Sequence, residues 1–315
     1  METVDLLRQD QTHLDYGDDQ IIPFKVGETS VRGRVVRLGP AIDEILKAHR
    51  FPDGPSELVG EMACLVAAMG ASLKFDGKLI LQAQGKGPVP MVVADYTADG
   101  ALRATASIHE GAHDKSGLGS LLGEGHMVVT IDQGPDMERY QGVTPVEGDT
   151  LEKAAVGYFM QSEQIPTVVR LAVGRMSRPG EGEVWRAGAI MAQFVPAEGG
   201  DRERGEEILR LEDDQEVWDR AEAFVQSTQA DELLDPSLAP EQLLYRLFHE
   251  DGVRVFDRKS VRAHCPCHAG KVEAVLSRYG EEELSDMAED GVIRVECEFC
   301  RTSYFFGPDG RALPQ

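Results

Sequence analysis

The sequences HCPCH, at residues 264–268, and VIRVECEFCRTSYFF, at residues 292–306, hold four of the five cysteines in the 315-residue chain. The four form a C-x-C pair and a C-x-x-C pair with 29 residues between them: Cys265, Cys267, Cys297 and Cys300. Four thiolates at these separations match the ligand set of a tetrahedral zinc ion. The sequence therefore predicts a Zn2+ site in a small C-terminal domain, with these four cysteines as the metal ligands.

Two histidines flank the C-x-C pair. His264 and His268 are of a residue type that binds zinc, and either could replace a cysteine as a ligand. Because four cysteines are available, we expect both histidines to lie outside the ligand set.

The predicted C-terminal domain covers residues 259–315, which is too short a segment for more than a marginal core. Zinc binding worth ~10–16 kcal/mol could exceed every other contribution to its stability, so loss of the metal is expected to unfold it. Many four-cysteine sites only stabilise a domain, and that structural role is the alternative.

The two cysteine pairs could also have a redox role. Each pair can close its own short loop, so oxidation is expected to join Cys265 to Cys267 and Cys297 to Cys300 and to expel zinc.

The composition argues against several classes of protein. The formal net charge is −23, from 32 basic and 55 acidic residues, and such a surface repels nucleic acid and anionic membranes. No apolar run reaches the ~18–20 residues of a membrane span, and the first residues, METVDLLRQD, lack the basic and apolar regions of a secretory signal. We therefore expect a cytoplasmic protein, in which paired cysteines are more often metal ligands or redox thiols than structural disulfides.

Residues 1–196 are predicted to form a mixed α+β core domain, because strand and helix patterns alternate along them. The first expected helix covers residues 41–50, and the second is an apolar stretch that runs from an N-cap at Ser56 to residue 75. A third helix is expected from a capping box at residues 149–152 to Gln161. The expected strands include residues 31–38, 167–173 and 187–195. Asp76-Gly77 predicts a hairpin turn. Cys64 lies inside the apolar helix and is predicted to be a small, buried core residue.

Residues 197–258 are predicted to form an acidic helical linker. Residues 198–235 contain fourteen acidic and four basic side chains, and apolar residues recur among them at helical spacing: Val217, Trp218, Ala221, Phe224 and Val225. Pro240 begins a second amphipathic helix. The narrow apolar stripe is expected to pack on the core domain, while repulsion among the acidic side chains is expected to weaken that packing.

Within the C-terminal domain, residues 270–280 and 281–291 are predicted helices, each ended by a glycine in the left-handed conformation, Gly280 or Gly291. Residues 292–306 are predicted to form a closing hairpin that carries the C-x-x-C pair.

One further motif, His109-Glu-Gly-Ala-His113, matches the HExxH pattern of zinc proteases. That chemistry requires both histidines on one face of a helix, whereas this stretch contains Gly111 and runs into a glycine-rich segment. We interpret the match as coincidental.

The sequence resembles the redox-regulated thirty-three-kilodalton chaperonin family, whose hallmark is a C-terminal C-x-C plus C-x-x-C quartet. Several other motifs support the resemblance along nearly the whole chain: Leu73–Gly77 (LKFDG), Gln82–Gly87 (QAQGKG), Glu138–Val143 (ERYQGV), Val146–Leu151 (VEGDTL), Tyr158–Gln164 (YFMQSEQ) and Arg246–Glu250 (RLFHE). The resemblance implies an α+β core, a helical linker and a C-terminal zinc domain, as the residue patterns also predict.

The resemblance also implies a function. It implies an ATP-independent holdase that is inactive when reduced and zinc-loaded, with Cys265, Cys267, Cys297 and Cys300 as both zinc ligands and redox sensors. Oxidation would form the Cys265–Cys267 and Cys297–Cys300 disulfides, release zinc, unfold the linker and yield active homodimers that bind unfolding client proteins. As a hypothesis, Trp218, Phe224 and Val225 supply the apolar surface that the linker exposes to clients.

Two alternatives remain open at this point. A thiol–disulfide oxidoreductase could use Cys297 and Cys300, although a thioredoxin-like βαβ setting is not evident around them. A constitutive zinc-ribbon binding module would keep its metal and would not respond to oxidation.

Overall fold

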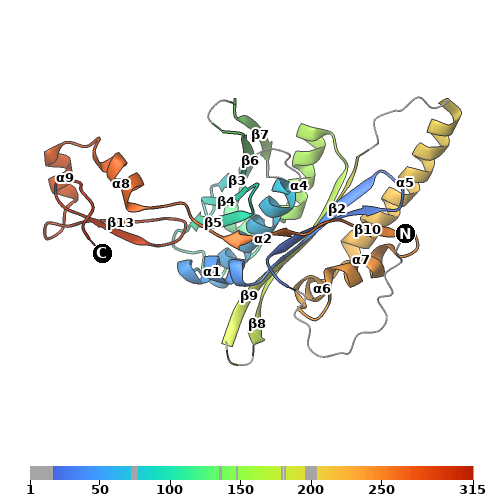
Figure 1. The fold of residues 1–315 in the computed structure, drawn as a ribbon, viewed down its shortest axis with the longest axis horizontal. Helices are drawn as coiled ribbons and strands as arrows, with labels where there is room; N and C mark the ends of the chain where they lie inside the picture. Colours follow the sequence, from blue (N-terminus) through green and yellow to red (C-terminus); the bar gives the residue numbers. More distant parts are fainter. Residues whose placement is uncertain are drawn as a thin grey trace.

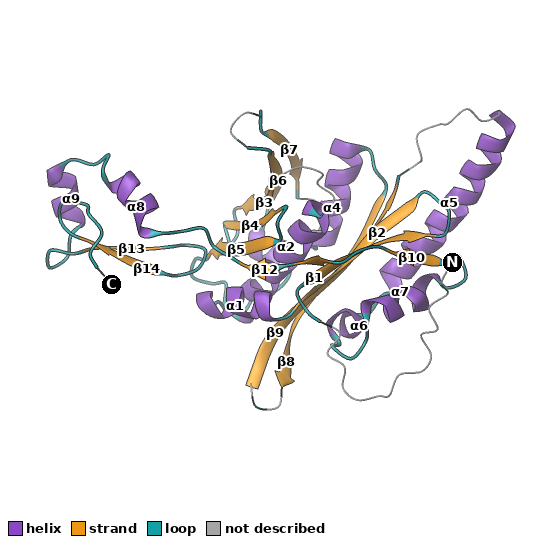
Figure 2. Ribbon diagram, in the orientation of Figure 1, coloured by secondary structure: helices purple, strands orange, loops and turns teal. Residues whose placement is uncertain are grey.

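The computed structural model describes residues 17–71, 77–134, 137–146, 148–178, 180, 182–195 and 204–314. Within these residues two six-stranded sheets, a layer of helices on each face of the first sheet and a small C-terminal hairpin make up a mixed α+β fold (Figures 1 and 2). The predicted fold class is therefore confirmed. The predicted Asp76-Gly77 turn falls at the edge of residues 72–76, which lie outside the described residues.

The first sheet is antiparallel and has the order β10 (Val253–Val255), β1 (Gln20–Val26), β2 (Val31–Leu38), β9 (Gly182–Phe194) and β8 (Thr167–Arg178), with β11 (Lys259–Ser260) also paired to β1. The two predicted strands at residues 167–173 and 187–195 are parts of the long β8–β9 hairpin. The alternating pattern at residues 31–38 does form a strand, but nearly all of it is buried because helices cover both faces of this sheet.

The second sheet has the order β12 (Arg262–Ala263), β5 (Ala101–Ser107), β4 (Met91–Thr97), β3 (Lys78–Gly85), β6 (Gly125–Asp132) and β7 (Tyr140–Pro145). Its pairs are antiparallel except for β12, which lies parallel to β5. The short strands β10, β11 and β12 therefore bring residues 253–263 back onto both sheets of the core.

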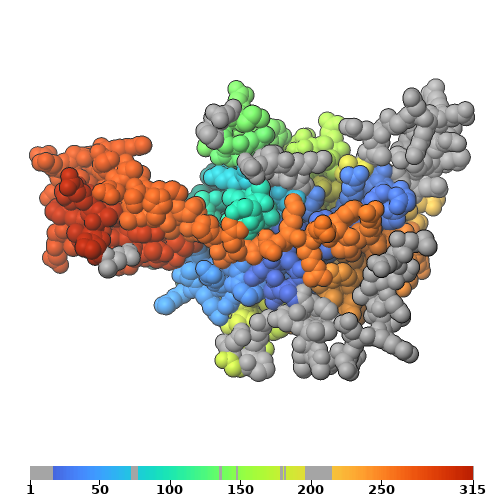
Figure 3. Space-filling model, viewed as in Figure 1, coloured from blue at the N-terminus to red at the C-terminus, as the bar shows by residue number. Residues whose placement is uncertain are grey.

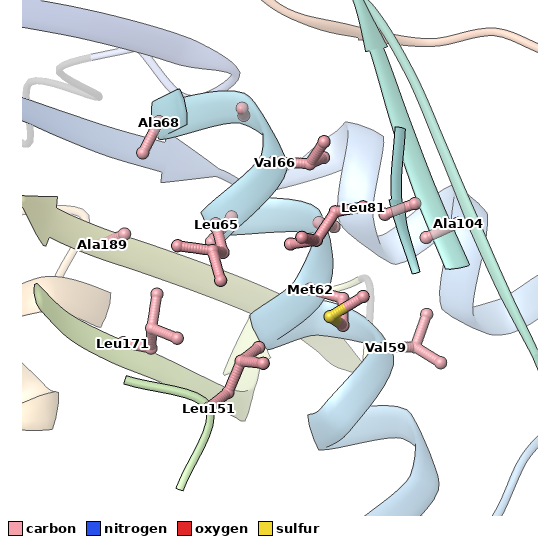
Figure 4. Packing of buried hydrophobic residues seen from close by; sticks show 14 of the residues in the cluster. Val59, Met62, Leu65, Val66, Ala68, Leu81, Ala104, Leu151, Leu171 and Ala189 are labelled. Atoms are coloured by element: carbon pink, nitrogen blue, oxygen red, sulfur yellow. The ribbon is translucent and has the colours of Figure 1, made fainter. Parts of the chain in front are cut away.

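Helix α2 (Asp53–Gly70) lies between the two sheets and is buried almost all round, as its apolar composition predicts (Figure 4). In this view Leu65 faces Leu171 and Ala189 of the first sheet, whereas Val59 and Val66 lie toward the second. Helix α1 (Pro40–His49) matches the predicted helix at residues 41–50. The predicted N-cap at Ser56 is wrong, because α2 begins one turn earlier after Pro52 and the Ser56 hydroxyl donates to the Phe51 carbonyl.

The shorter helices of the core are α3 (Leu118–Leu122), α4 (Leu151–Tyr158) and the π-helical turn η1 (Phe159–Glu163). Helix α4 is capped by Thr150, whose side chain accepts from the Lys153 amide, so the predicted box is shifted by one residue. Glu152 instead accepts from the Leu171 amide and pairs with Arg170 on β8. It therefore ties α4 to the sheet.

Three helices cover the outer face of the first sheet: α5 (Arg204–Ser227), α6 (Ala230–Leu234) and α7 (Pro240–Phe248). Trp218 and Val225 on α5 are buried against the sheet, and Phe224 is partly buried beside them. The Trp218 ring lies 6.1 Å from that of Phe194 at the end of β9. The predicted apolar stripe therefore does pack on the core.

Two buried arginines of the first sheet fasten α6 and the turn after it. Arg37 on β2 donates to the main-chain carbonyl oxygens of Glu232, Asp235 and Leu238. Arg186 on β9 donates to the Leu234 carbonyl at 2.8 Å and pairs with Asp18. These contacts place two guanidinium groups beneath the linker, which the acidic charge pattern alone does not indicate.

The C-terminal unit projects from one end of the core (Figures 1 and 3) and contains α8 (Ala269–Leu276), α9 (Glu281–Met287), β13 (Ile293–Glu296) and β14 (Ser303–Phe306). Its buried core consists of four residues: Leu276, Leu284, Ile293 and Phe306. The predicted glycine caps are wrong. Gly280 precedes α9 as its N-cap at φ −74°, and Gly291, at φ +78°, lies in the turn after α9 has ended. The predicted hairpin is confirmed.

The HExxH stretch is not helical. His109 and His113 are exposed in a turn after β5, and Gly111 has a φ of +93°. The coincidental interpretation is therefore confirmed. Among the helices in the described part of the chain, none is both long and apolar enough to span a membrane.

Candidate metal centre

The C-x-x-C pair lies in the turn of the β13–β14 hairpin. The Cys297 amide donates to the Thr302 carbonyl at 2.9 Å, and the Arg301 amide donates back to the Cys297 carbonyl at 2.8 Å. Arg301 takes a left-handed φ of +58°, which closes the turn. The hairpin ladder therefore fixes Cys297 and Cys300 on one tight loop.

The C-x-C pair follows directly from the edge of the second sheet. The His264 amide donates to the Leu102 carbonyl of β5 at 3.0 Å, immediately before Cys265. On the other side of the pair, His268 caps the start of α8, and Lys271 donates to the Pro266 carbonyl at 2.6 Å. Cys265 and Cys267 are thus held between a core strand and the first helix of the C-terminal unit.

The fold brings the four cysteine sulfurs together: all lie within 4.8 Å of one another. The Sγ atoms of Cys265 and Cys297 are 3.6 Å apart, and those of Cys267 and Cys300 are 3.3 Å apart. A tetrahedral zinc ion with Zn–S bonds of ~2.3 Å separates its sulfurs by about 3.8 Å, so the donor set and its spacing fit zinc. Among the described residues this metal-competent group contains neither His264 nor His268.

The surroundings of the four thiols are unequal. Burial raises the pKa of Cys267, whose sulfur lies 3.1 Å from the Tyr304 hydroxyl. Burial acts in the same direction at Cys300, but hydrogen bonds with the Thr302 hydroxyl and amide and with Cys267 and Cys297 outweigh it and lower the pKa of that thiol to about 7. The lowered pKa favours the thiolate form of Cys300, which is the form that binds a metal.

The core domain contacts the cysteine cluster through two side chains of β5. Arg103 donates to Cys265 Sγ at 3.7 Å, and its guanidinium carbon lies 3.9 Å from the centroid of the Phe299 ring. Thr105 donates to the Glu298 carbonyl at 2.8 Å. The sequence does not predict these contacts, because they join residues more than 160 positions apart and alternation in a strand indicates only which face a side chain occupies.

Cys64 lies far from this cluster in the chain and is fully buried in α2, as predicted. Burial raises the pKa of its thiol, and the neighbouring Glu61 acts in the same direction. We expect iodoacetamide to leave Cys64 unmodified in the native protein while it labels all five cysteines in guanidinium chloride. A Cys64→Ala variant should keep the zinc content of the parent chain. Rapid alkylation of native Cys64, measured by peptide mass spectrometry, would show that this thiol is accessible.

Comparison with known proteins identifies the chain. The family described as Hsp33 protein matches residues 19–307, which include both sheets, the linker helices and all four clustered cysteines. The chain belongs to the Hsp33 family. Membership gives it a chaperone function, and because chaperonins are not enzymes the oxidoreductase alternative is not supported.

Curated Hsp33 relatives are similar over nearly their full length. The 33 kDa chaperonin of Caulobacter vibrioides is 46% identical over 302 residues, covering 93% of this chain and 96% of the relative. The 33 kDa chaperonin of Shewanella loihica is 35% identical over 278 residues, and the alignment covers 88% of this chain and 88% of the relative. The crystal structure of the 33 kDa chaperonin from Thermotoga maritima superposes with a TM-score of 0.75 over 93% of this chain and 96% of its own, at 21% identity, and so shares the Hsp33 fold.

The predicted client-binding residues lie apart from the cysteines in this fold. Trp218, Phe224 and Val225 lie on the side of α5 that packs on the outer face of the first sheet, whereas the cysteines lie beside the edge of the second sheet. Their proposed role needs a conformational change that uncovers them.

Proposed function

We propose that the chain is a redox-regulated, ATP-independent holdase of the cytoplasm, which is inactive when reduced and zinc-loaded and binds unfolding proteins after oxidation. One observation carries the proposal: four sulfurs converge in a unit whose own buried core has only four residues, and that unit continues directly into strands of the core. Bound zinc would hold the four sulfurs as thiolates and stabilise the unit.

Cys265, Cys267, Cys297 and Cys300 would be the ligands and the redox sensors. Two equivalents of a peroxide take four electrons from the four thiolates and form two S–S bonds. With four protons, the peroxide becomes four molecules of water, and the metal leaves as Zn2+. The sulfur cluster therefore loses both its metal and its thiolate charge in the same reaction.

The connection between the C-terminal unit and the linker is short. Cys265 lies two residues after β12, and β12, β11 and β10 are each only two or three residues long. Only short ladders to β1 and β5 and single side-chain contacts such as the Arg262–Asp99 pair hold these strands on the core, and α7 precedes them in the chain. We infer that unfolding proceeds from the cysteines through residues 253–263 into the linker helices.

Departure of the linker would uncover the apolar face of the first sheet together with the stripe of α5. Phe24, Val35 and Ile190 of the sheet and Trp218 and Val225 of the helix now bury one another. Exposed apolar surface of this kind binds unfolded chains and also drives association. We therefore place the client contacts of Trp218, Phe224 and Val225 here, in a homodimer of the oxidised chain.

The proposal also specifies which cysteines become joined by disulfides. In the folded cluster two short sulfur distances cross between the pairs, from Cys265 to Cys297 and from Cys267 to Cys300. Once the unit unfolds, loop-closure entropy favours bonds within each pair, Cys265–Cys267 and Cys297–Cys300. Peptide mapping of the oxidised protein should find these two bonds, and cross-pair bonds would show that oxidation precedes unfolding.

The experiment that tests the function compares two states of the same full-length protein. The peroxide-oxidised, zinc-free chain should suppress light scattering of a heat-denatured client at about stoichiometric ratio, without ATP, whereas the reduced, zinc-loaded chain should not. Dithiothreitol and zinc added together should reverse the change. Equal suppression by both states would instead indicate a constitutive zinc module, and no suppression by either would contradict the holdase.

A further inference from the structure

Arg103 is one of the two β5 side chains that contact the cysteine cluster, and it carries the charge of that contact. It lies on β5 directly opposite Asp95 on β4, and its Nε and Nη2 donate to the same Asp95 oxygen, Oδ2, at 2.9 and 2.6 Å. Its Nη1 donates to Cys265 Sγ, and its plane lies against the ring of Phe299, between Cys297 and Cys300. Arg103 therefore contacts the C-x-C pair through Cys265 and the C-x-x-C segment through Phe299.

The charge facing Arg103 depends on the state of the cysteines. Four thiolates around Zn2+ carry a net charge of −2, whereas two disulfides carry none. The Arg103 side chain is only 23% exposed and its partner Asp95 only 7%, so solvent screens their interactions less than those of a surface pair. Oxidation with metal loss thus removes two negative charges from the side of the guanidinium that faces Cys265.

Asp95 offers Arg103 a second arrangement. Its other oxygen, Oδ1, is buried and has no hydrogen-bond partner among the described residues. A guanidinium pairs most favourably with a carboxylate when two N–H groups meet two oxygens. In the observed arrangement both N–H groups meet one oxygen while Nη1 is directed to Cys265. If Cys265 no longer attracts the guanidinium, Arg103 can pair with both oxygens of Asp95.

We propose that Arg103 is a charge-dependent docking contact. It holds the C-terminal unit on the core while the cysteine cluster is anionic, and it releases that unit when the cluster becomes neutral. The release half of this proposal rests on the redox function proposed above; the docking half does not. The neighbouring hydrogen bond from Thr105 to the Glu298 carbonyl supports the same contact without responding to charge.

The test uses the reduced, zinc-loaded, full-length protein and an Arg103→Met variant. The variant keeps all four cysteines, so it should still bind zinc at the parent stoichiometry. Hydrogen exchange of residues 259–268 and 297–302 should be about tenfold faster, the order expected when the charge-assisted hydrogen bond from Arg103 to Cys265 is lost. Zinc release to peroxide, followed with a chromogenic chelator, should accelerate by a similar factor.

Two features separate a charge effect from a loss of packing. Raising the salt concentration should speed exchange in the parent protein more than in Arg103→Met, because the variant keeps the other charges of this region, such as the Arg301–Glu296 pair, but lacks the guanidinium that faces Cys265. Arg103→Lys should restore part of the protection, because it keeps the charge but not the planar fork. Arg139→Met is the matched control, since it removes an arginine–aspartate pair with Asp132 near the far edge of the same sheet and should change nothing.

The outcomes are distinct. Parent-like exchange and zinc release in Arg103→Met would overturn the proposal, as would equal acceleration in Arg103→Met and Arg103→Lys with no dependence on salt. In the oxidised, zinc-free state the parent and Arg103→Met should show the same exchange at residues 297–302, and a remaining difference there would contradict the release half. Failure of the oxidised parent to hold clients would defeat the holdase proposal while leaving the exchange results on docking intact.

Discussion

Replacement of Cys267 by serine is expected to abolish tight zinc binding and to unfold the C-terminal unit while the core stays folded. Cys267 Sγ lies 3.3 Å from that of Cys300 and 3.1 Å from the Tyr304 hydroxyl, so it is central to the cluster. Zinc in a four-cysteine site contributes ~10–16 kcal/mol, whereas burial of Leu276, Leu284, Ile293 and Phe306 contributes about 6–12 kcal/mol, too little by itself to offset the conformational entropy of ordering the unit. Amides of β13 and β14 should therefore lose their protection from hydrogen exchange.

The matched control is His268→Ala, which alters a neighbour of Cys267 that lies outside the group of converging sulfurs. This variant should keep one zinc per chain and its hairpin protection. Zinc content by atomic absorption and exchange by mass spectrometry measure both properties on the same samples. Stoichiometric zinc in Cys267→Ser, or its loss in His268→Ala, would show that the ligand set is not the four cysteines. The buried cluster around α2 should remain protected in both variants.

The cysteine cluster could be predicted from the sequence because its signal is local. Each cysteine pair is separated by one or two residues, and the hairpin that carries Cys297 and Cys300 shows the alternation of a strand pair. Pairs that are close in sequence are close in any fold, so only the meeting of the two pairs depended on tertiary structure. The same reasoning explains why Cys64, alone in an apolar helix, was correctly interpreted as core.

The contacts that join the domains could not be predicted, because they depend on which strands become neighbours. Arg103 reaches Cys265 only because β12 pairs with β5, and β12 has two residues and no pattern of its own. Arg37 occupies what looks like a polar position of an alternating strand, yet it is 2% exposed because α6 covers it. The start of α4 also differs from the prediction by one residue. Asp149 and Thr150 are both good N-cap residues, and the backbone geometry that selects Thr150 is not visible in the sequence.

Replacement of Trp218 by alanine is expected to detach the linker while zinc stays bound. Trp218 is 6% exposed between α5 and the first sheet, and removal of a buried tryptophan side chain costs about 3–5 kcal/mol. Because acidic repulsion already opposes docking of this segment, that loss should make exchange in α5, α6 and α7 markedly faster. Glu216→Asp, an exposed change two residues earlier on the same helix that keeps the negative charge, is the control and should leave the exchange rates unchanged.

A second variant loosens the linker from the opposite side. Gly188 on β9 lies beneath α6, and a Cβ atom there would approach the Leu233 carbonyl oxygen to 2.6 Å, closer than packed atoms allow. Gly188→Ala should therefore displace α6 with Trp218 still present. If the uncovered sheet holds clients, both variants should suppress client aggregation without oxidant. If Trp218 itself makes the client contact, Gly188→Ala should be active and Trp218→Ala should not. A linker that is detached in both variants, with neither active until peroxide is added, would place the client surface outside this interface.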